Sequence, residues 1–177
     1  MTYRASYLSP LGAITLASDG KALTGLWFDG QKYFARTLPK EYAESETPVL
    51  REAKRWLDIY FSGREPDFTP PLHPVGSAFQ QVVWALLLEI PYGETTTYGT
   101  LARKLAEKQG LTHMSAQAVG GAVGHNDISL IIPCHRVVGA SGSLTGYAGG
   151  VDKKIKLLEL ERADMKSFFV PKKGTAL

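Results

Sequence analysis

Three short segments near the start of the chain have the hydrophobic pattern of β-strands. They alternate apolar and polar residues or are rich in strand-forming residues, and they span residues 4–8, 13–18 and 23–28. Turn-forming sequences separate them, Ser9-Pro10-Leu11-Gly12 and Ser18-Asp19-Gly20. Because strands joined by such short turns pair with their neighbours, the pattern predicts a small antiparallel meander.

Helical spacing of apolar residues follows the strands. Residues 48–61 carry apolar side chains three and four positions apart, and Gly63 comes after them as a helix end. In the second half, a residue able to cap a helix precedes each of three further apolar patterns: Ser77, Thr97 and Ser115. The first predicted helix of this half starts at residue 78. The other three span residues 98–108, 116–123 and 152–163.

Proline and glycine divide the chain. Residues 63–76 contain four prolines and two glycines, a composition that disfavours helix and sheet and is typical of a linker. A chain of 177 residues suits one large domain or two small ones. We therefore predict an α+β fold with two domains, residues 1–76 as an N-terminal α/β domain with a small antiparallel sheet and residues 77–177 as a mainly helical C-terminal domain.

Two of the predicted helices form a candidate DNA-binding motif. Residues 98–108 and 116–123 are joined by a short segment containing Gly110, as in a helix-turn-helix, although many helical hairpins share this pattern. The helix from Ala116 has almost no side-chain bulk, and each glycine costs roughly 1 kcal/mol inside a helix. Close approach to a groove wall and tight packing against another helix both account for that composition.

Charge is distributed unevenly along the chain. The formal net charge is +3, and all of the excess lies in residues 77–177, which carry 11 basic and 8 acidic residues. A modest excess is weak evidence for a polyanionic partner. The longest apolar run, residues 82–88, is too short to span a membrane, and the first residues lack the apolar core of a secretory signal. We expect a cytoplasmic protein without a membrane partner.

Cys134 is the single cysteine, which excludes an internal disulfide and argues against a structural zinc site. It lies in Pro133-Cys134-His135-Arg136, directly after the apolar run of residues 128–132. A thiol reacts as its thiolate, and an adjacent base or cation lowers its pKa or accepts its proton. A lone cysteine is more often a small buried hydrophobic residue, but the preceding proline is typical of a fixed turn.

This segment resembles the active-site segment of the O6-alkylguanine-DNA alkyltransferases, or methylated-DNA–protein-cysteine methyltransferases. The matching residues are Pro133-Cys134-His135-Arg136, Val137-Val138, Gly142 and Tyr147-Ala148-Gly149-Gly150. Upstream, the resemblance continues through Phe79, Val83-Trp84, Ile90-Pro91-Tyr92-Gly93-Glu94-Thr95, Tyr98-Gly99 and Ala118-Val119-Gly120. The motifs cover residues 77–162 densely. The N-terminal part is similar only in its layout, which implies a ribonuclease H-like domain.

The resemblance implies DNA repair in a single step. The alkyl group of O6-alkylguanine in double-stranded DNA would pass irreversibly to Cys134 after the nucleotide rotates out of the duplex, and O4-alkylthymine is a second candidate substrate. A soft thiolate suits displacement at a saturated carbon, and the chain has no second thiol to relieve the product. The resemblance therefore implies one turnover per molecule, no metal or organic cofactor, and a monomer that binds the minor groove.

Matches to the family's motifs imply roles for the residues around Cys134. Cys134 matches the alkyl acceptor, His135 the histidine that deprotonates it through a water molecule, and Glu161 the carboxylate that orients the histidine. Asn126 matches the asparagine that braces the turn before the active-site segment. Tyr98 matches the tyrosine that can donate a proton to the leaving guanine. We expect Arg136 to be a structural ion-pair partner.

Two further sets of residues follow from the same resemblance. The nucleobase pocket is assigned to Val137, Tyr147, Ala148, Gly149 and Val123. The DNA contacts are assigned to Gln117, Ala118, Gly121, Thr97, Ser115 and Lys104, with Lys108 and Lys154 as further candidates for contact with phosphates.

Two positions depart from the family's pattern. An arginine usually precedes Ala118-Val119-Gly120 and fills the space left by the extruded base, but this chain has Gln117, which can stack and hydrogen-bond without the charge. Ala148 stands where some members carry a serine. Because of Gln117, a non-catalytic sensor of alkylated DNA remains an alternative function. Sensors of this kind, however, replace the acceptor cysteine. The residues also fit a helix-turn-helix regulator, or a cysteine hydrolase that uses Cys134 and His135.

Overall fold

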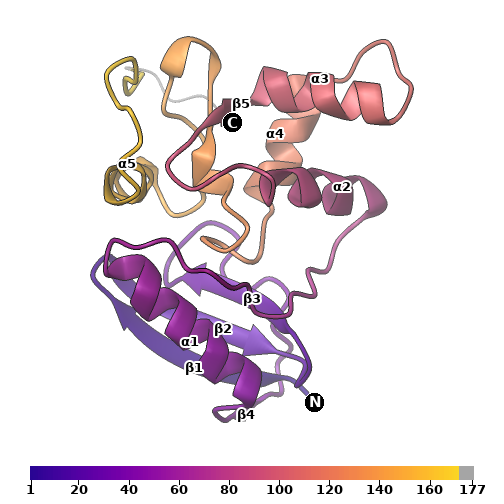
Figure 1. Ribbon diagram of the computed structural model, residues 1–177. Coiled ribbons are helices and arrows are strands. Elements are labelled where there is room, and N and C mark those ends of the chain that lie inside the picture. Colours follow the sequence, from indigo (N-terminus) through magenta and orange to yellow (C-terminus); the bar gives the residue numbers. More distant parts are fainter. Residues whose placement is uncertain (172–177) are drawn as a thin grey trace. The chain divides into compact units, whose positions relative to one another are not determined.

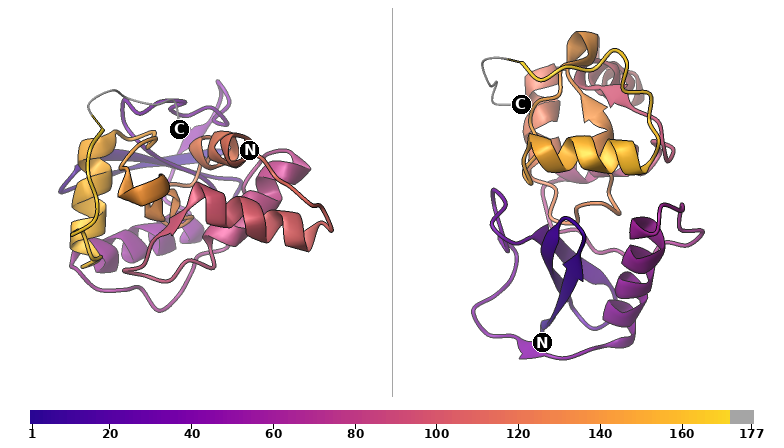
Figure 2. Two further views of the ribbon diagram at one scale, coloured as in Figure 1. Left: turned by 90° about the horizontal axis from the view of Figure 1, so that it is seen from above. Right: turned by 90° about the vertical axis from the view of Figure 1, so that its left-hand side faces the viewer.

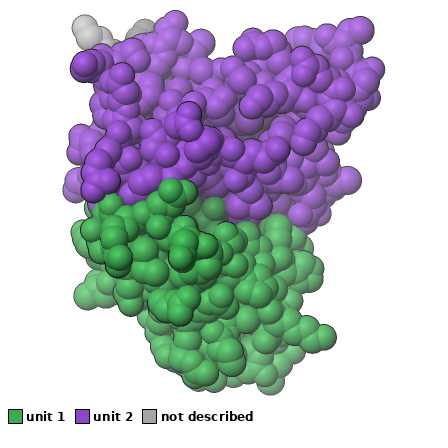
Figure 3. All heavy atoms as spheres, in the orientation of Figure 1, with its two compact units in different colours: residues 1–75, 127–131 green, residues 76–126, 132–177 purple. Residues whose placement is uncertain are grey.

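The computed structural model describes residues 1–171, and the chain divides into two compact units (Figure 1, Figure 3). Unit 1 comprises residues 1–75 and 127–131, and unit 2 comprises residues 76–126 and 132–177. Residues 172–177 of the predicted C-terminal domain lie outside the described residues. The segment 127–131, which the sequence places in that domain, belongs to unit 1.

Unit 1 is built on a four-stranded sheet in the order β3-β2-β1-β4. The predicted antiparallel meander is present as β1 (Tyr3–Ser9), β2 (Gly12–Ser18) and β3 (Leu23–Phe28). A strand of two residues, β4 (Ala43–Glu44), adds to β1 in parallel. The sheet is therefore mixed, because β4 is parallel to β1 while the other pairs are antiparallel. This short edge strand was not predicted.

One helix packs on this sheet. α1 (Pro48–Phe61) starts at Thr47, whose side chain accepts a hydrogen bond from the N–H of Leu50, and it contacts β1, β2 and β3 (Figure 1, Figure 2). Leu50, Ala53 and Leu57 are fully buried at the predicted helical spacing. The apolar stripe of α1 and the sheet thus form the core of unit 1.

Residues 127–131 join the edge of the same sheet. The N–H of Leu26 donates to the carbonyl of Asp127 over 2.8 Å, and the N–H of Ser129 returns a bond to the carbonyl of Leu26 over 3.0 Å. The buried Asp127 carboxylate accepts the indole N–H of Trp27 over 3.1 Å and pairs with Arg36 over 2.5 Å. Backbone pairing and a buried charge network therefore account for the place of this segment in unit 1.

The described part of unit 2 contains four α-helices, α2 (Ala78–Leu87), α3 (Tyr98–Lys108), α4 (Ala116–Gly124) and α5 (Val151–Leu160). The predicted caps are present: the side chains of Ser77, Thr97 and Ser115 each accept a backbone N–H three residues later. α3 packs against α4 as expected for a helix-turn-helix, and both contact α2. α5 ends earlier than predicted because Arg162 has a positive φ of 58°.

Short elements surround the segment that contains Cys134. A 3-10 turn spans Cys134–Arg136, and β6 (Val137–Val138) then pairs in parallel with β5 (Thr96–Thr97). A second 3-10 turn spans Ala140–Gly142, and α5 packs against the first one. No helix within residues 1–171 is long and apolar enough to cross a membrane.

Candidate active site

The turn that carries Cys134 is fixed by its backbone. The carbonyl of Ile132 accepts the N–H of Cys134 over 2.8 Å, and the carbonyl of Pro133 accepts the N–H of Arg136 over 3.0 Å. The side-chain amide of Asn126 donates to the same Ile132 carbonyl over 2.8 Å. The position predicted to brace this turn therefore has a buried hydrogen bond into it, which holds Cys134 in place.

His135 and Glu161 form a fully buried pair. Their Nε2 and Oε2 atoms are 2.5 Å apart, and both side chains are 0% exposed. Burial lowers the pKa of His135 despite the nearby carboxylate, so the imidazole is neutral. An ionised carboxylate can only accept, so Nε2 carries the hydrogen that is donated to Glu161.

Arg136 completes this network as an ion-pair partner, as expected. Its Nε lies 2.7 Å from Oε1 of Glu161. Burial alone would raise the pKa of Glu161, but the hydrogen bonds and charges of His135 and Arg136 hold that pKa well below its usual range. The carboxylate therefore remains ionised and fixes the orientation of the imidazole.

Residues 90–93, which follow α2 and match a motif of the family, form one wall of the network. The Arg136 guanidinium donates to the carbonyl of Ile90 over 2.8 Å and lies 5.7 Å from the ring centroid of Tyr92. The N–H of Gly93 donates to Oε1 of Glu161 over 3.2 Å. A Cβ at Gly93 would lie 3.0 Å from the Glu161 carbonyl oxygen, and φ there is +79°, so this position favours glycine.

Cys134 itself is buried, with 6% of its surface exposed. Burial raises the pKa of its thiol, while a hydrogen bond from Asn126 and the charge of Lys154 act in the opposite direction. Burial and the charge of Cys134 raise the pKa of Tyr98, so its phenol keeps the proton. The ring of Tyr147 meets that of His135 edge-on, with centroids 6.4 Å apart. Asn126 and Tyr98 thus interact with the thiol, and Tyr147 packs against the neighbouring imidazole.

The other predicted residues fall into two groups. Val123 and Val137 are fully buried, and Ala148 and Gly149 are half-buried before the start of α5. On the helix-turn-helix, the exposed predicted residues are Lys104 and Lys108 of α3 and Ser115, Gln117, Ala118 and Gly121 at α4. The ammonium of Lys108 lies 3.7 Å from a carboxylate oxygen of Glu89. Thr97 is half-buried, and its hydroxyl, like that of Ser115, caps a helix.

Lys154 was predicted to contact phosphate, and that prediction is wrong. The residue is fully buried in α5, and its ammonium donates to two backbone carbonyls. Lysine is seldom buried, and that general tendency favoured an exposed position for Lys154. Helical spacing does place it on the buried face of α5, three and four positions before Leu157 and Leu158, and that signal was missed.

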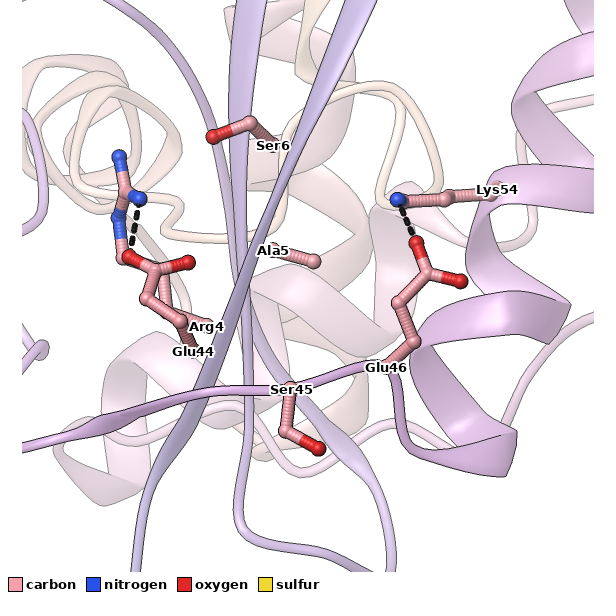
Figure 4. Close-up of a pocket in the computed structure, with 7 residues that line it drawn as sticks. All are labelled: Arg4, Ala5, Ser6, Glu44, Ser45, Glu46 and Lys54. Atoms are coloured by element: carbon pink, nitrogen blue, oxygen red, sulfur yellow. Dashed lines mark hydrogen bonds and ion pairs between the residues drawn. The ribbon is translucent and has the colours of Figure 1, made fainter.

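A hollow lies on the surface of unit 1. It has a volume of about 350 Å³ and is lined by Arg4, Ala5, Ser6, Glu44, Ser45, Glu46 and Lys54. Its charged side chains pair with one another, Arg4 with Glu44 and Lys54 with Glu46 (Figure 4). In the part of the chain that the structure describes, no group of three or more histidine, cysteine or acidic residues is placed to hold a metal ion.

Two family models match the chain. The model described as 6-O-methylguanine DNA methyltransferase, ribonuclease-like domain, matches residues 2–74. The model described as the DNA binding domain of the same methyltransferase matches residues 78–163, which contain the thiol, the imidazole and the carboxylate described above.

Individual relatives agree with these matches. A methylated-DNA–protein-cysteine methyltransferase of Haemophilus influenzae is 42% identical over 161 residues, which cover 90% of this chain and 86% of the relative. A methylated-DNA–protein-cysteine methyltransferase of Methanosarcina acetivorans is 44% identical over 160 residues, which cover 90% of this chain and 97% of the relative. The crystal structure of Mycobacterium tuberculosis OGT in complex with DNA has a TM-score of 0.78 and 42% identity, and covers 90% of this chain and 92% of that one. The chain belongs to the 6-O-methylguanine DNA methyltransferase family.

Proposed function

We propose that this protein repairs alkylated DNA by accepting, on Cys134, the alkyl group of O6-alkylguanine in double-stranded DNA. O4-alkylthymine is a second candidate substrate. The observation that carries the proposal is the buried array in which neutral His135, next to the thiol in the chain, is held by the ionised Glu161. Relatives named for methyl transfer to a protein cysteine, and a related structure in complex with DNA, support this substrate class.

The proposed step is a displacement at the saturated carbon attached to O6. The sulfur electron pair forms the S–C bond while the bond between that carbon and O6 breaks, and one proton moves from the thiol to the leaving guanine. Because Nε2–H of His135 is donated to Glu161, the thiol proton would pass through a water molecule to Nδ1. The thioether product cannot reverse, so each molecule reacts once and needs no cofactor.

Tyr98 is suited to protonate the departing base. Its pKa is raised by burial and by the charge of Cys134, so the phenol is a donor at neutral pH. A guanine that leaves without a proton carries negative charge, and a donor at hydrogen-bond distance lowers the barrier to its departure. Val137, Tyr147 and the backbone of residues 148–149 would form the walls around the flipped base.

The exposed face of α4 is the proposed DNA-contacting surface. Gln117, Ala118 and Gly121 are exposed on one side of this helix, whereas Val119 and Val123 are buried. A Cβ at Gly121 would have no atom within 4 Å, so packing inside the protein does not explain the glycine. A bare face suits close approach to the minor groove, with the exposed Lys104 near a phosphate. We propose a cytoplasmic monomer that associates with the nucleoid when bound.

Mass spectrometry tests the proposal directly. After incubation with a duplex that contains one O6-methylguanine, we expect the peptide with Cys134 to gain the mass of one methylene unit. The added mass should reach one equivalent per protein molecule and then stop, even with excess duplex. A duplex with unmodified guanine is the control.

The three rival functions predict different results. A folded protein that binds the alkylated duplex without gaining mass would be a sensor and would refute the proposal. Repeated hydrolysis of a small ester or amide, lost on replacement of Cys134, would indicate a cysteine hydrolase. Binding that ignores the alkyl group, again without an adduct, would indicate a regulator.

The substitution Gln117→Arg is expected to strengthen repair. A guanidinium at this exposed position adds charge and a planar cation to fill the space of an extruded base, which predicts a roughly three- to tenfold gain in rate or affinity from ~1 kcal/mol of stacking. Single-turnover rates and fluorescence anisotropy with the methylated duplex measure both quantities. Gln117→Lys serves as the control for charge alone. If neither quantity changes in Gln117→Arg, Gln117 does not occupy the stack.

A further inference from the structure

Lys154 is the one lysine of α5 that is fully buried. It is 0% exposed, whereas Lys156 on the same helix is exposed. An ammonium removed from water is stable only where hydrogen bonds and charge compensate for the lost hydration. The contacts of Lys154 therefore indicate what its burial achieves.

The ammonium of Lys154 binds two backbone carbonyls, one at each end of the segment 137–145. Nζ donates to the carbonyl of Val137 over 2.5 Å and to the carbonyl of Thr145 over 2.8 Å. Val137 follows the Cys134 turn directly, and Thr145 precedes Tyr147 by two residues. The Tyr98 hydroxyl also approaches the Thr145 carbonyl, at 3.5 Å. Lys154 thus closes the loop of residues 137–145 at both of its ends.

Charge links the same ammonium to the thiol. Within residues 1–171, the structure shows no ion pair between Lys154 and a carboxylate. Burial lowers the pKa of Lys154 to about 8, and the charge of Cys134 acts in the opposite direction. The charge of Lys154, together with a hydrogen bond from Asn126, in turn opposes the effect of burial on the Cys134 pKa.

We propose that Lys154 is a positioning residue for alkyl transfer, which fixes the loop between Val137 and Thr145 and stabilises the negative charge on the sulfur of Cys134. A positive charge near the sulfur favours the thiolate over the thiol, so it raises the fraction of protein that carries the reactive nucleophile. The part of the proposal that concerns DNA rests on the proposed function; the part that concerns the thiol does not.

The test compares Lys154→Met, Lys154→Arg and Lys156→Met. Lys156→Met removes one positive charge from the same helix at an exposed position and is the matched control. The pH dependence of alkylation by iodoacetamide reports the thiol pKa, and Cys134 is the only cysteine that can react. Single-turnover transfer from the O6-methylguanine duplex reports positioning, and circular dichroism with thermal melting reports folding.

In Lys154→Met, we expect the thiol pKa to rise by about one pH unit and transfer to slow by at least about tenfold. Lys154→Arg should keep the thiol pKa but slow transfer by a similar factor, because a planar guanidinium does not reproduce the two carbonyl contacts of an ammonium. Lys156→Met should remain within about twofold of the wild type in both measurements.

A folded Lys154→Met protein with the wild-type thiol pKa and transfer rate would overturn the proposal. If that variant does not fold, Lys154→Arg decides: slower transfer at an unchanged thiol pKa supports the proposal, and unchanged transfer or a raised pKa contradicts it. If the wild type forms no adduct with the duplex, the proposed function fails, and the iodoacetamide profile still tests the effect of Lys154 on the thiol.

Discussion

The substitution Glu161→Gln is expected to slow alkyl transfer by about 10³- to 10⁴-fold, the loss typical when the carboxylate behind a catalytic histidine becomes an amide. Oε1 of Glu161 accepts from Arg136 and Oε2 from Nε2 of His135. A glutamine has only one acceptor, and the guanidinium can only donate, so the amide nitrogen would face the imidazole. Nε2 would then have to accept, and the hydrogen would move to Nδ1, the atom proposed to take the thiol proton.

The same substitution is expected to lower the free energy of unfolding by about 3–5 kcal/mol, because it leaves the buried guanidinium of Arg136 without its counter-charge. Single-turnover kinetics and urea unfolding measure the two effects. Glu159→Gln is the matched control, since Glu159 lies exposed on α5 two residues earlier. Transfer in Glu161→Gln at a rate close to that of the control would contradict the role of the carboxylate.

The stability of the protein at low pH should depend on the same charge network. The pKa of Glu161 is lower in the folded protein than in the unfolded chain, so its contribution to stability is complete above the unfolded value of ~4.3 and is lost as the pH falls below it. The wild type should therefore lose stability between about pH 5 and pH 3 more steeply than Glu161→Gln, which has no carboxyl group to protonate at this position.

Local pattern predicted the regular elements of this chain. The apolar spacing and the Thr97 cap gave α3 with the bounds that the structure has, and alternation gave β3. The strands that were missed are β4, β5 and β6, each of two residues. A segment so short carries no periodicity, and it becomes a strand only through a partner distant in sequence.

Long-range partners also explain the other differences. The run at residues 128–132 was recognised as buried, but its place in unit 1 depends on pairing with β3 and on the contacts of Asp127 with Trp27 and Arg36. Helical spacing separates Lys154, which shares a face with Leu157 and Leu158, from the exposed Lys156, but the general rarity of buried lysine favoured exposure for both. The motif order, by contrast, predicted Cys134, His135 and Glu161 as a site, and the structure brings His135 and Glu161 into contact.

The substitution Cys134→Ser is expected to abolish the adduct while leaving a folded protein that still binds the alkylated duplex. Serine preserves the size of the side chain, and its hydroxyl stays protonated at the pH at which a thiol begins to ionise. Loss of the nucleophile in comparable sites slows reaction by on the order of 10⁶-fold, so no mass should be gained in hours. The chain has no other cysteine to substitute for it.

Intact mass spectrometry and fluorescence anisotropy on the same samples separate chemistry from recognition. We expect Cys134→Ser to bind the methylated duplex within about threefold of the wild type, since the exposed face of α4 is unchanged and a conservative buried substitution shifts stability by only ~1 kcal/mol. Transfer of the methyl group to any residue of Cys134→Ser would place the acceptor elsewhere. Loss of both binding and the adduct would mean that the thiol contributes to the fold. Peptide mapping of the wild-type adduct would then have to show whether Cys134 is the nucleophile.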